Sequence, residues 1–422
     1  MKKIEIVIII IMITTLLLAS IPIISSCAKD NGGISIVPVV SGEKSDELAN
    51  KVDRGLVGSN TDFAFNIFSR LIIEDSGQNV FISPLSILLA IAMTYNGAIG
   101  DTNLAIAEAM EFSGMDMEEL NQGFSDLMVS ILNGDPDVEI NIANSIWPKS
   151  GSDPQEDFID INKKYYSSEV KELDFSDPGA VDTINGWIED ATEEKIKKML
   201  KEIPPDAVMY LINAIYFKGD WTYPFEEGST FDEDFNLEDG SKKPVPMMHI
   251  TEHFEYMAGD GFGAVRLPYG EEEKFSMYIV LPDEGVEIDG ILEGFDGDNW
   301  SDLGSGMSDM EVRLAMPKYK MEYGVKLLND VLTDLGMGIA FGPEADFSGI
   351  NPDIFISRVM HKAVIEVNEK GSEAAAATVV EMVESAMPAG EIIEFIVDRP
   401  FFFVIADDRS GAILFMGKVV EP

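Results

Sequence analysis

The sequence contains a single cysteine, Cys27, so no disulfide bond can form within the chain. Its three histidines offer little for a serine–histidine catalytic triad, and no G-x-S-x-G motif is present. Without disulfides, stability must come from a hydrophobic core. The 422 residues are 46% apolar, which is enough to form a large core. We therefore expect neither a disulfide scaffold nor an enzyme.

Basic residues are also scarce. The chain has 30 Lys and Arg against 75 Asp and Glu, a formal net charge of −45, and no Lys or Arg lies between Arg70 and Lys149. Nucleic acids and anionic membranes are bound by clustered Lys and Arg, which replace counterions. The charge therefore argues against a nucleic-acid partner and predicts a solvated, soluble surface.

The N-terminus has two lysines followed by an almost unbroken apolar run over residues 6–24. This order is typical of a secretory signal, and the run is also just long enough to span a bilayer. It ends in Ser25-Ser26-Cys27, which resembles the lipobox of lipoprotein signals, whose cysteine is lipidated. Residues 1–27 are thus either a lipoprotein signal or an uncleaved membrane anchor. In both cases the body is expected outside the cytoplasm, extracellular or at the cell surface.

The polar residues 28–52 show no sustained period and are expected to form a flexible tether. Beyond them, helical spacing of apolar residues predicts helices over Thr61–Ile73, Leu85–Tyr95 and Thr183–Lys201. The strand-like runs are Asn79–Ile82, Ala207–Phe217, Phe275–Leu281, Glu311–Pro317, Ala363–Val367, Phe401–Ala406 and Ile413–Val420. Strands dominate late and βαβ alternation is absent, which predicts an α+β fold with large antiparallel sheets.

Residues 369–388 form the most informative stretch. Its four alanines, Ala374–Ala377, favour a helix, whereas the strand-like Val364–Val367 precedes them and the β-prone Val379-Val380 follows. The segment is therefore locally undecided, and its side chains are small enough to enter a packed space.

This stretch resembles the hinge and reactive-centre loop of inhibitory serpins. The resemblance continues in ordered segments over about residues 55 to 422, namely Asn79–Ser86, Gly97-Ala98, Ala143–Trp147, Asn213–Trp221, His361–Asn368, Phe395–Phe401 and Phe415–Val419. It implies one serpin domain over 53–422, with a large mixed or antiparallel sheet A, two further β-sheets and about eight or nine helices.

The resemblance also implies a mechanism. A serine protease cleaves the loop, about residues 369–392, and is trapped as an acyl-enzyme while the loop inserts into sheet A as a new strand. No cofactor is implied. Heparin is not expected, because the basic helix of heparin-activated members has no counterpart between Arg70 and Lys149. A monomer is expected.

The hinge implied by the resemblance has small, uncharged side chains on its inward face. In the family's register Ser372, Ala374, Ala376 and Thr378 point inward, where a bulky or charged group would be overpacked or buried unpaired. The remaining hinge residues are Glu369, Gly371, Ala375 and Ala377, and Gly371 suits the bend at which the strand enters.

Counting along the loop from Glu369 by the family's usual spacing places the cleaved bond between Ser385 and Ala386, with Glu384–Ser385 as the alternative. Ser385 would suit an elastase-like or subtilisin-like protease, and Glu384 a glutamate-preferring one. A trypsin-like target is not expected, because no Lys or Arg lies between Glu373 and Arg399.

Other family positions form a gate. Trp221 matches the breach, where the loop first enters, and the polar shutter beneath the sheet is matched by Ser83, Pro84, Ser86, Asn213 and His361. Such a buried hydrogen-bonded network can rearrange as the sheet opens.

His361 and Trp221 are equally well interpreted as core residues, and neither is catalytic. The surface segment 192–196 carries Glu194 where the family often has glycine.

Two alternatives remain. His249–His253 has the H-x-x-E-H spacing of inverted zinc proteases, which would require a helix, but its proline-containing flanks favour strands, so no metal site is expected. A non-inhibitory serpin acting as a carrier or chaperone is the second, although such members usually have bulky or charged hinge residues, unlike Gly371 and Ser372.

Overall fold

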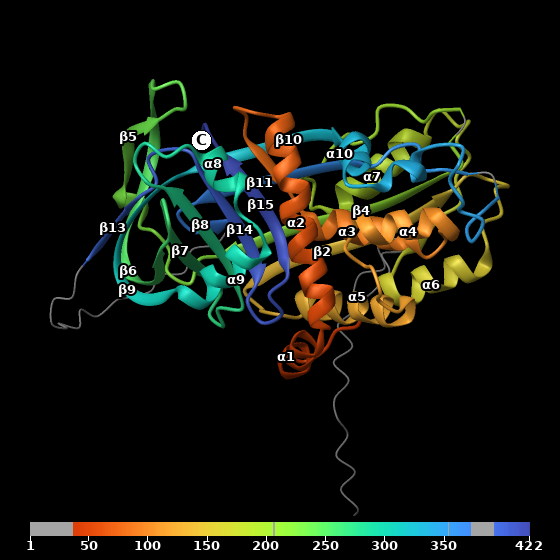
Figure 1. Cartoon of the computed structure of the whole chain (residues 1–422), viewed down its shortest axis with the longest axis horizontal. Coiled ribbons are helices and arrows are strands. Elements are labelled where there is room, and N and C mark those ends of the chain that lie inside the picture. Colours follow the sequence, from red (N-terminus) through yellow and green to blue (C-terminus); the bar gives the residue numbers. More distant parts are fainter. Residues whose placement is uncertain (1–36, 206, 353, 373–391) are drawn as a thin grey trace, which may run out of the picture. The chain divides into compact units, whose positions relative to one another are not determined.

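The computed structural model describes residues 37–205, 207–352, 354–372 and 392–422, which belong to one unit. Its helices, some of them labelled in Figure 1, are α1 (Gly42–Lys51), α2 (Arg54–Glu74), α3 (Pro84–Tyr95), α4 (Gly100–Ala109), α5 (Met117–Leu132), α6 (Glu156–Tyr166), α7 (Ala180–Ala191), α8 (Ile288–Glu293), α9 (Gly297–Gly306) and α10 (Asn329–Asp334). No helix among these residues is long and apolar enough to cross a membrane.

The strands alternate with these helices early and follow one another late. They are β1 (Val80–Ile82), β2 (Val138–Pro148), β3 (Glu169–Val170), β4 (Met209–Asp220), β5 (Thr230–Asn236), β6 (Lys242–Ala258), β7 (Phe262–Tyr269), β8 (Phe275–Pro282), β9 (Ser308–Pro317), β10 (Tyr319–Leu327), β11 (Met360–Asn368), β12 (Gly371–Ser372), β13 (Ile393–Ile396), β14 (Phe401–Asp407) and β15 (Ile413–Val419). The α+β prediction is confirmed.

Two hydrogen-bonded sheets result. The six-stranded sheet has the order β10-β11-β12-β4-β2-β3 and is mixed, because β3 runs parallel to β2. The nine-stranded sheet has the order β1-β15-β14-β8-β7-β6-β9-β13, with β5 beside β6. The 17 residues of β6 pair in turn with β5, β9 and β7. The strands outside the six-stranded sheet, which corresponds to sheet A of the serpin resemblance, therefore join into one sheet. Figure 1 shows α4, α6 and α7 at the opposite end of the body from β5, β6 and β13.

The sequence explains why α3 forms and where it lies. Ser83 caps its N-terminus by accepting a hydrogen bond from the amide of Ser86, and Pro84 takes the first position, where its fixed φ and missing N–H suit a helix. Every residue of α3 except Ala90 is buried. The helix therefore lies inside the core and supports the six-stranded sheet from within, as its apolar composition predicts.

The helix predicted over Thr183–Lys201 is wrong beyond Ala191, where α7 ends. Glu193 and Glu194 have φ of 46° and 62°, and this left-handed backbone breaks the helix. Ile196 and Leu200 are still buried in one cluster with the apolar face of α7. The apolar spacing therefore predicted their burial correctly, but these two residues belong to an irregular loop and not to a helix.

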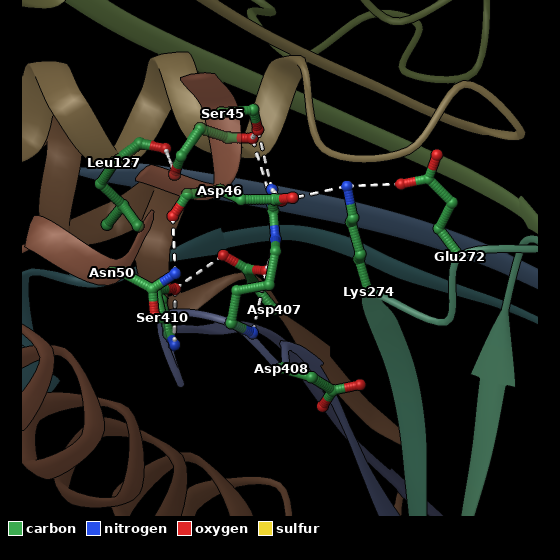
Figure 2. A network of polar contacts seen from close by, with 12 residues as sticks. Ser45, Asp46, Asn50, Leu127, Glu272, Lys274, Asp407, Asp408 and Ser410 are labelled. Atoms are coloured by element: carbon green, nitrogen blue, oxygen red, sulfur yellow. Dashed lines mark hydrogen bonds and ion pairs between the residues drawn. The ribbon is translucent and has the colours of Figure 1, made fainter. Parts of the chain in front are cut away.

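The tether predicted over residues 28–52 is wrong in its second half, because residues 42–51 form α1. Ser41 caps this helix, and Ala49 is buried. Arg409 fixes α1 to the turn between β14 and β15: its guanidinium donates to Ser45 Oγ at 2.8 Å and to Asp46 at 3.2 Å. Lys274 also pairs with Asp46, at 3.0 Å (Figure 2). These charged hydrogen bonds hold a helix whose own sequence has no strong apolar period.

Candidate functional site

The short strand β12 lies between β4 and β11 in the six-stranded sheet, and β4 and β11 form no ladder with each other among the described residues. β4 pairs with β2 and β12, whereas β11 pairs with β10 and β12. β12 has only two residues, so it separates the two long strands at one end alone. We call the space between residues 209–218 of β4 and 360–366 of β11 the slot.

β12 lies at one end of the slot, where it pairs with both flanking strands. Gly371 pairs with Asp220 on one side and Asn368 on the other, and Ser372 is the last described residue before the loop. A Cβ atom at position 371 would lie 2.0 Å from the backbone oxygen of Gly219, a distance that real side chains do not adopt. Glycine is therefore required sterically where the chain enters the sheet.

Aromatic side chains support β12 from below. The hydroxyl of Ser372 lies 2.7 Å from the phenol oxygen of Tyr269. The Tyr269 ring stacks on Trp221 with 4.5 Å between centroids, and Trp221 Nε1 donates to the carbonyl of Asn368 at 3.0 Å. Trp221, predicted from the resemblance, thus contacts the strand that leads into the hinge. Tyr269 was not predicted, because nothing near it in the sequence marks it.

Glu369 holds the chain just before β12. Its carboxylate accepts hydrogen bonds from Lys318 Nζ at 2.8 Å and Thr230 Oγ1 at 3.0 Å, and its backbone carbonyl accepts from the amide of Phe225 at 2.8 Å. Burial raises the pKa of the Glu369 carboxyl, but the hydrogen bonds outweigh burial and hold the pKa below its ordinary value. Glu369 is therefore an ionised anchor at the hinge.

A polar cluster lies beneath the slot and joins α3 to both flanking strands. Nε2 of His361 accepts from the amide of Ser83 at 3.1 Å, and Ser83 Oγ donates to the carbonyl of Leu414 at 2.7 Å. Ser86 Oγ donates to Asn213 Oδ1. The structure thus brings together the serines, the asparagine and the histidine that sequence reasoning named, and Pro84 begins the helix that carries the serines.

The cluster continues through residues that sequence reasoning missed. Asn213 Nδ2 donates to Asn144 Oδ1 at 2.7 Å, and Asn144 Nδ2 donates to the carbonyl of Tyr166 at 2.7 Å. The only signal for Asn144 was its place inside the family-like segment Ala143–Trp147. Burial lowers the pKa of His361 to about 4, so the imidazole is neutral near pH 7 and carries its proton on Nδ1.

Two cavities lie along the slot. One of about 340 Å³ lies at the end away from β12, between residues 209–213 of β4, the start of β11 and α3. The other, of about 20 Å³, lies further toward β12 and is lined by residues 215–217 and 363–365. Residues of both β4 and β11 therefore line each of the two cavities.

Several predicted residues lie outside the described part of the chain. They are Cys27, the hinge residues Ala374, Ala375, Ala376, Ala377 and Thr378, and the loop residues Glu384, Ser385 and Ala386. The proline-containing flanks of His249–His253 predicted strands, and this segment does belong to a strand, β6. At about 3.3 Å per residue along a strand, its two histidines are too far apart to bind one zinc ion. His249 stacks on Phe231, and His253 contacts Asp309 at 3.1 Å.

Known proteins share this architecture. The family described as Serpin (serine protease inhibitor) matches residues 58–422. An uncharacterized serpin-like protein of Thermococcus kodakarensis is 36% identical, over 90% of this chain and 88% of its own length, and leukocyte elastase inhibitor of Bos taurus is 35% identical, over 87% and 99%.

Solved structures agree with the sequence comparison. The thermophilic serpin tengpin in its native state superposes with a TM-score of 0.81 at 32% identity, covering 88% of this chain and 95% of tengpin. Human thyroxine-binding globulin with its hormone gives 0.80 at 29% identity, covering 89% and 99%. The match over most of the chain, together with the slot and the strand entering it, makes this protein a member of the serpin family.

Proposed function

We propose that this protein inhibits serine proteases as a suicide substrate, with the cleaved loop inserting into the slot as a new strand. The observation that carries the proposal is that β12 already occupies the first two positions of that strand. It pairs with both β4 and β11, which have no other partner on their facing edges within the described residues. Unpaired strand edges favour the addition of a strand.

The register of β12 supports the proposal. Ser372 pairs with Gly219 of β4 and with Val367 of β11. A strand continued in this register brings Thr378 opposite both Asn213 and His361, beside the polar cluster. Thr378 shares the parity of the buried Ser372, so its hydroxyl would meet a hydrogen-bonding environment and not an apolar one.

Insertion would release free energy. Each new hydrogen bond is worth about 0.5–1.5 kcal/mol net, so a strand paired on both sides gains on the order of 10 kcal/mol. The uncleaved fold would then be metastable and held by a kinetic barrier. The polar cluster around His361, which joins α3 to both flanking strands, and the anchoring of Glu369 before β12 are contacts that this barrier would include.

The cleaved bond and its protease follow from the loop sequence. We propose cleavage at Ser385–Ala386, with Glu384–Ser385 as the alternative, by an elastase-like or subtilisin-like protease. The similarity to bovine leukocyte elastase inhibitor favours the first choice. We also propose that the protein is exported as a monomer and is attached to the membrane by a lipid on Cys27 or by an uncleaved anchor. It would function without a heparin-like cofactor.

The test is a denaturing gel after separate incubation with elastase, subtilisin and a glutamyl endopeptidase. The expected result is a band at the summed mass that survives denaturant, with sequencing of the released peptide to identify the bond. A matched pair of variants sharpens it. Ala376→Glu places a charge on the inward face and should convert the inhibitor into a cleaved substrate, whereas Ala375→Glu faces outward and should still trap the protease.

A carrier function is the competing proposal, favoured by the likeness to thyroxine-binding globulin, whose structure contains a bound hormone. A carrier would be cleaved in the loop without a covalent band. If cleavage also brings no rise in melting temperature, insertion does not occur and the inhibitor proposal fails.

A further inference from the structure

The cavity of about 340 Å³ at the far end of the slot has an unusual lining for so acidic a protein. Its wall is mainly aliphatic, with Ile91 from α3, Met209 and Leu211 from β4, and Ile350. Ala90 faces this space, which explains why it alone in α3 is only half-buried. A preformed, mostly apolar cavity of this size suits a small organic ligand.

Among the described residues that line the cavity, Arg358 is the one that carries a charge. The chain has 75 acidic residues, yet none of those that the structure describes lines this cavity, whereas Arg358 does. The Arg358 side chain is 40% exposed, and its Nη2 lies 3.8 Å from the Glu202 carboxylate, too far for a hydrogen bond. A guanidinium at an apolar cavity therefore has donors free to bind an anion in two-pronged fashion.

We propose that this cavity binds an aliphatic carboxylate, a medium-chain fatty acid of about eight to twelve carbons. The alkyl chain packs against the aliphatic wall from α3 and β4, and the carboxylate accepts hydrogen bonds from Arg358. A neutral apolar molecule would leave the guanidinium without a role, and a polyanion would place its charge against the aliphatic wall.

A bound fatty acid would also affect loop insertion, and only this consequence rests on the proposed function. The cavity contacts β4 and the start of β11, so the ligand touches both edges of the slot. In the register of β12, the inward residues Val380 and Met382 of an inserted strand would arrive at Leu211 and Met209. The ligand and the far end of the inserted loop would therefore compete for one space.

Calorimetric titration of the full-length chain with octanoate, decanoate and dodecanoate tests the binding site. Affinity should rise about fourfold per added methylene until the cavity is full. Arg358→Gln should weaken decanoate about three- to tenfold, as expected for a partly exposed charged contact, and leave 1-decanol unchanged. Arg313→Gln, an exposed arginine of β9, is the matched control and should change neither ligand.

A second variant tests the apolar wall. Ala90→Phe fills the cavity and should abolish binding of both decanoate and 1-decanol. A melting curve establishes that this variant folds, and Ala207→Phe fills the same cavity from another wall if it does not. All these variants carry the same N-terminal apolar segment, so differences between them report the cavity. Equal binding of decanoate by the wild type, Arg358→Gln and the filled variant would overturn the proposal.

The consequence for inhibition is measured separately. With decanoate bound, the protein should form fewer covalent complexes and more cleaved product, and Ala90→Phe should no longer respond to decanoate. If the yield of covalent complex is the same with and without saturating decanoate, the ligand and the inserted loop do not compete. If no protease is trapped even without decanoate, the proposed function fails while the binding titrations still decide the site.

Discussion

The hydroxyl oxygen of Ser372 lies 2.7 Å from the phenol oxygen of Tyr269, beneath the point where β12 enters the sheet. Ser372 is 1% exposed, and Tyr269 is fully buried. A small polar side chain therefore already occupies the first inward position of the proposed inserted strand, and its partner comes from the other sheet. The described fold therefore already holds the first residues of the strand that the proposed insertion would extend.

This contact predicts how substitutions of Ser372 behave. Ser372→Arg would bury a guanidinium beside Tyr269 without a counter-charge, so β12 should leave the sheet and the loop should insert poorly. We expect at least a tenfold loss of covalent complex, with loop cleavage retained. Ser372→Ala removes one hydrogen bond, costs about 1 kcal/mol and should still trap the protease. Equal trapping by Ser372→Arg and Ser372→Ala would contradict a role for this position in insertion.

Patterns that are local in sequence were predicted well. The apolar run of α3, the strands β14 and β15, and the strands β4 and β11 follow from periodicity and composition, because a buried element must be apolar on the faces it buries. The resemblance indicated that glycine suits position 371, whereas the steric requirement for it, set by the oxygen of Gly219, is visible only in the structure.

Features that depend on distant partners were not predicted. Lys318 and Tyr269 reach the site from other parts of the chain, and nothing in their own neighbourhoods indicates this. For Asn144 the one signal was its place inside the family-like segment Ala143–Trp147. The helix α1 was missed for the same reason, since its fixation depends on Arg409, far away in sequence. The end of α7 was missed because apolar spacing also occurs in a packed irregular loop.

The pair Glu369–Lys318 predicts a pH-dependent contribution to stability. The folded-state pKa of Glu369 is lowered, so the pair stabilises the protein above the carboxyl's unfolded pKa, near 4.5, and this contribution is lost as the pH falls through the folded value. Lys318→Met should reduce the free energy of unfolding at pH 7 by about 1 kcal/mol, because the Lys318 side chain is 43% exposed and solvent screens its contact with Glu369.

Urea unfolding at pH 7 and at pH 3 measures this effect, and the difference between the wild type and Lys318→Met should shrink at the lower pH. Lys320→Met is the control, because Lys320 is 60% exposed and its pair with Glu366 should contribute little. A constant difference at both pH values would show that Lys318 acts through packing and not through the ionised Glu369.

The left-handed backbone at Glu194 predicts a stabilising substitution. Its φ of 62° costs a residue with a Cβ about 1 kcal/mol or more, whereas glycine adopts this region freely. Part of this gain is offset because glycine has more freedom in the unfolded chain. Glu194→Gly should therefore raise the free energy of unfolding by about 0.5 kcal/mol, measured by urea titration. Asp190→Gly, inside α7, should instead lower it by about 0.3 kcal/mol, because glycine disfavours a helix somewhat more than aspartate does.

His361 predicts a separate pH effect in the polar cluster beneath the slot. Burial lowers its pKa from 6.5 to about 4, so the folded protein binds the proton more weakly than the unfolded chain. The stabilisation is fully present above the unfolded pKa of 6.5 and is lost as the pH falls toward 4, an amplitude of about 3 kcal/mol.

A variant that cannot titrate isolates this contribution. The free energy of unfolding of His361→Gln should change less between pH 7 and pH 4.5 than that of the wild type, whatever its stability at pH 7. His253→Gln removes a histidine that is 51% exposed and should keep the wild-type slope. Because the Glu369 effect belongs to lower pH, the two windows separate the hinge from the cluster. A slope unchanged in His361→Gln would mean that this histidine is not held neutral in the polar cluster beneath the slot.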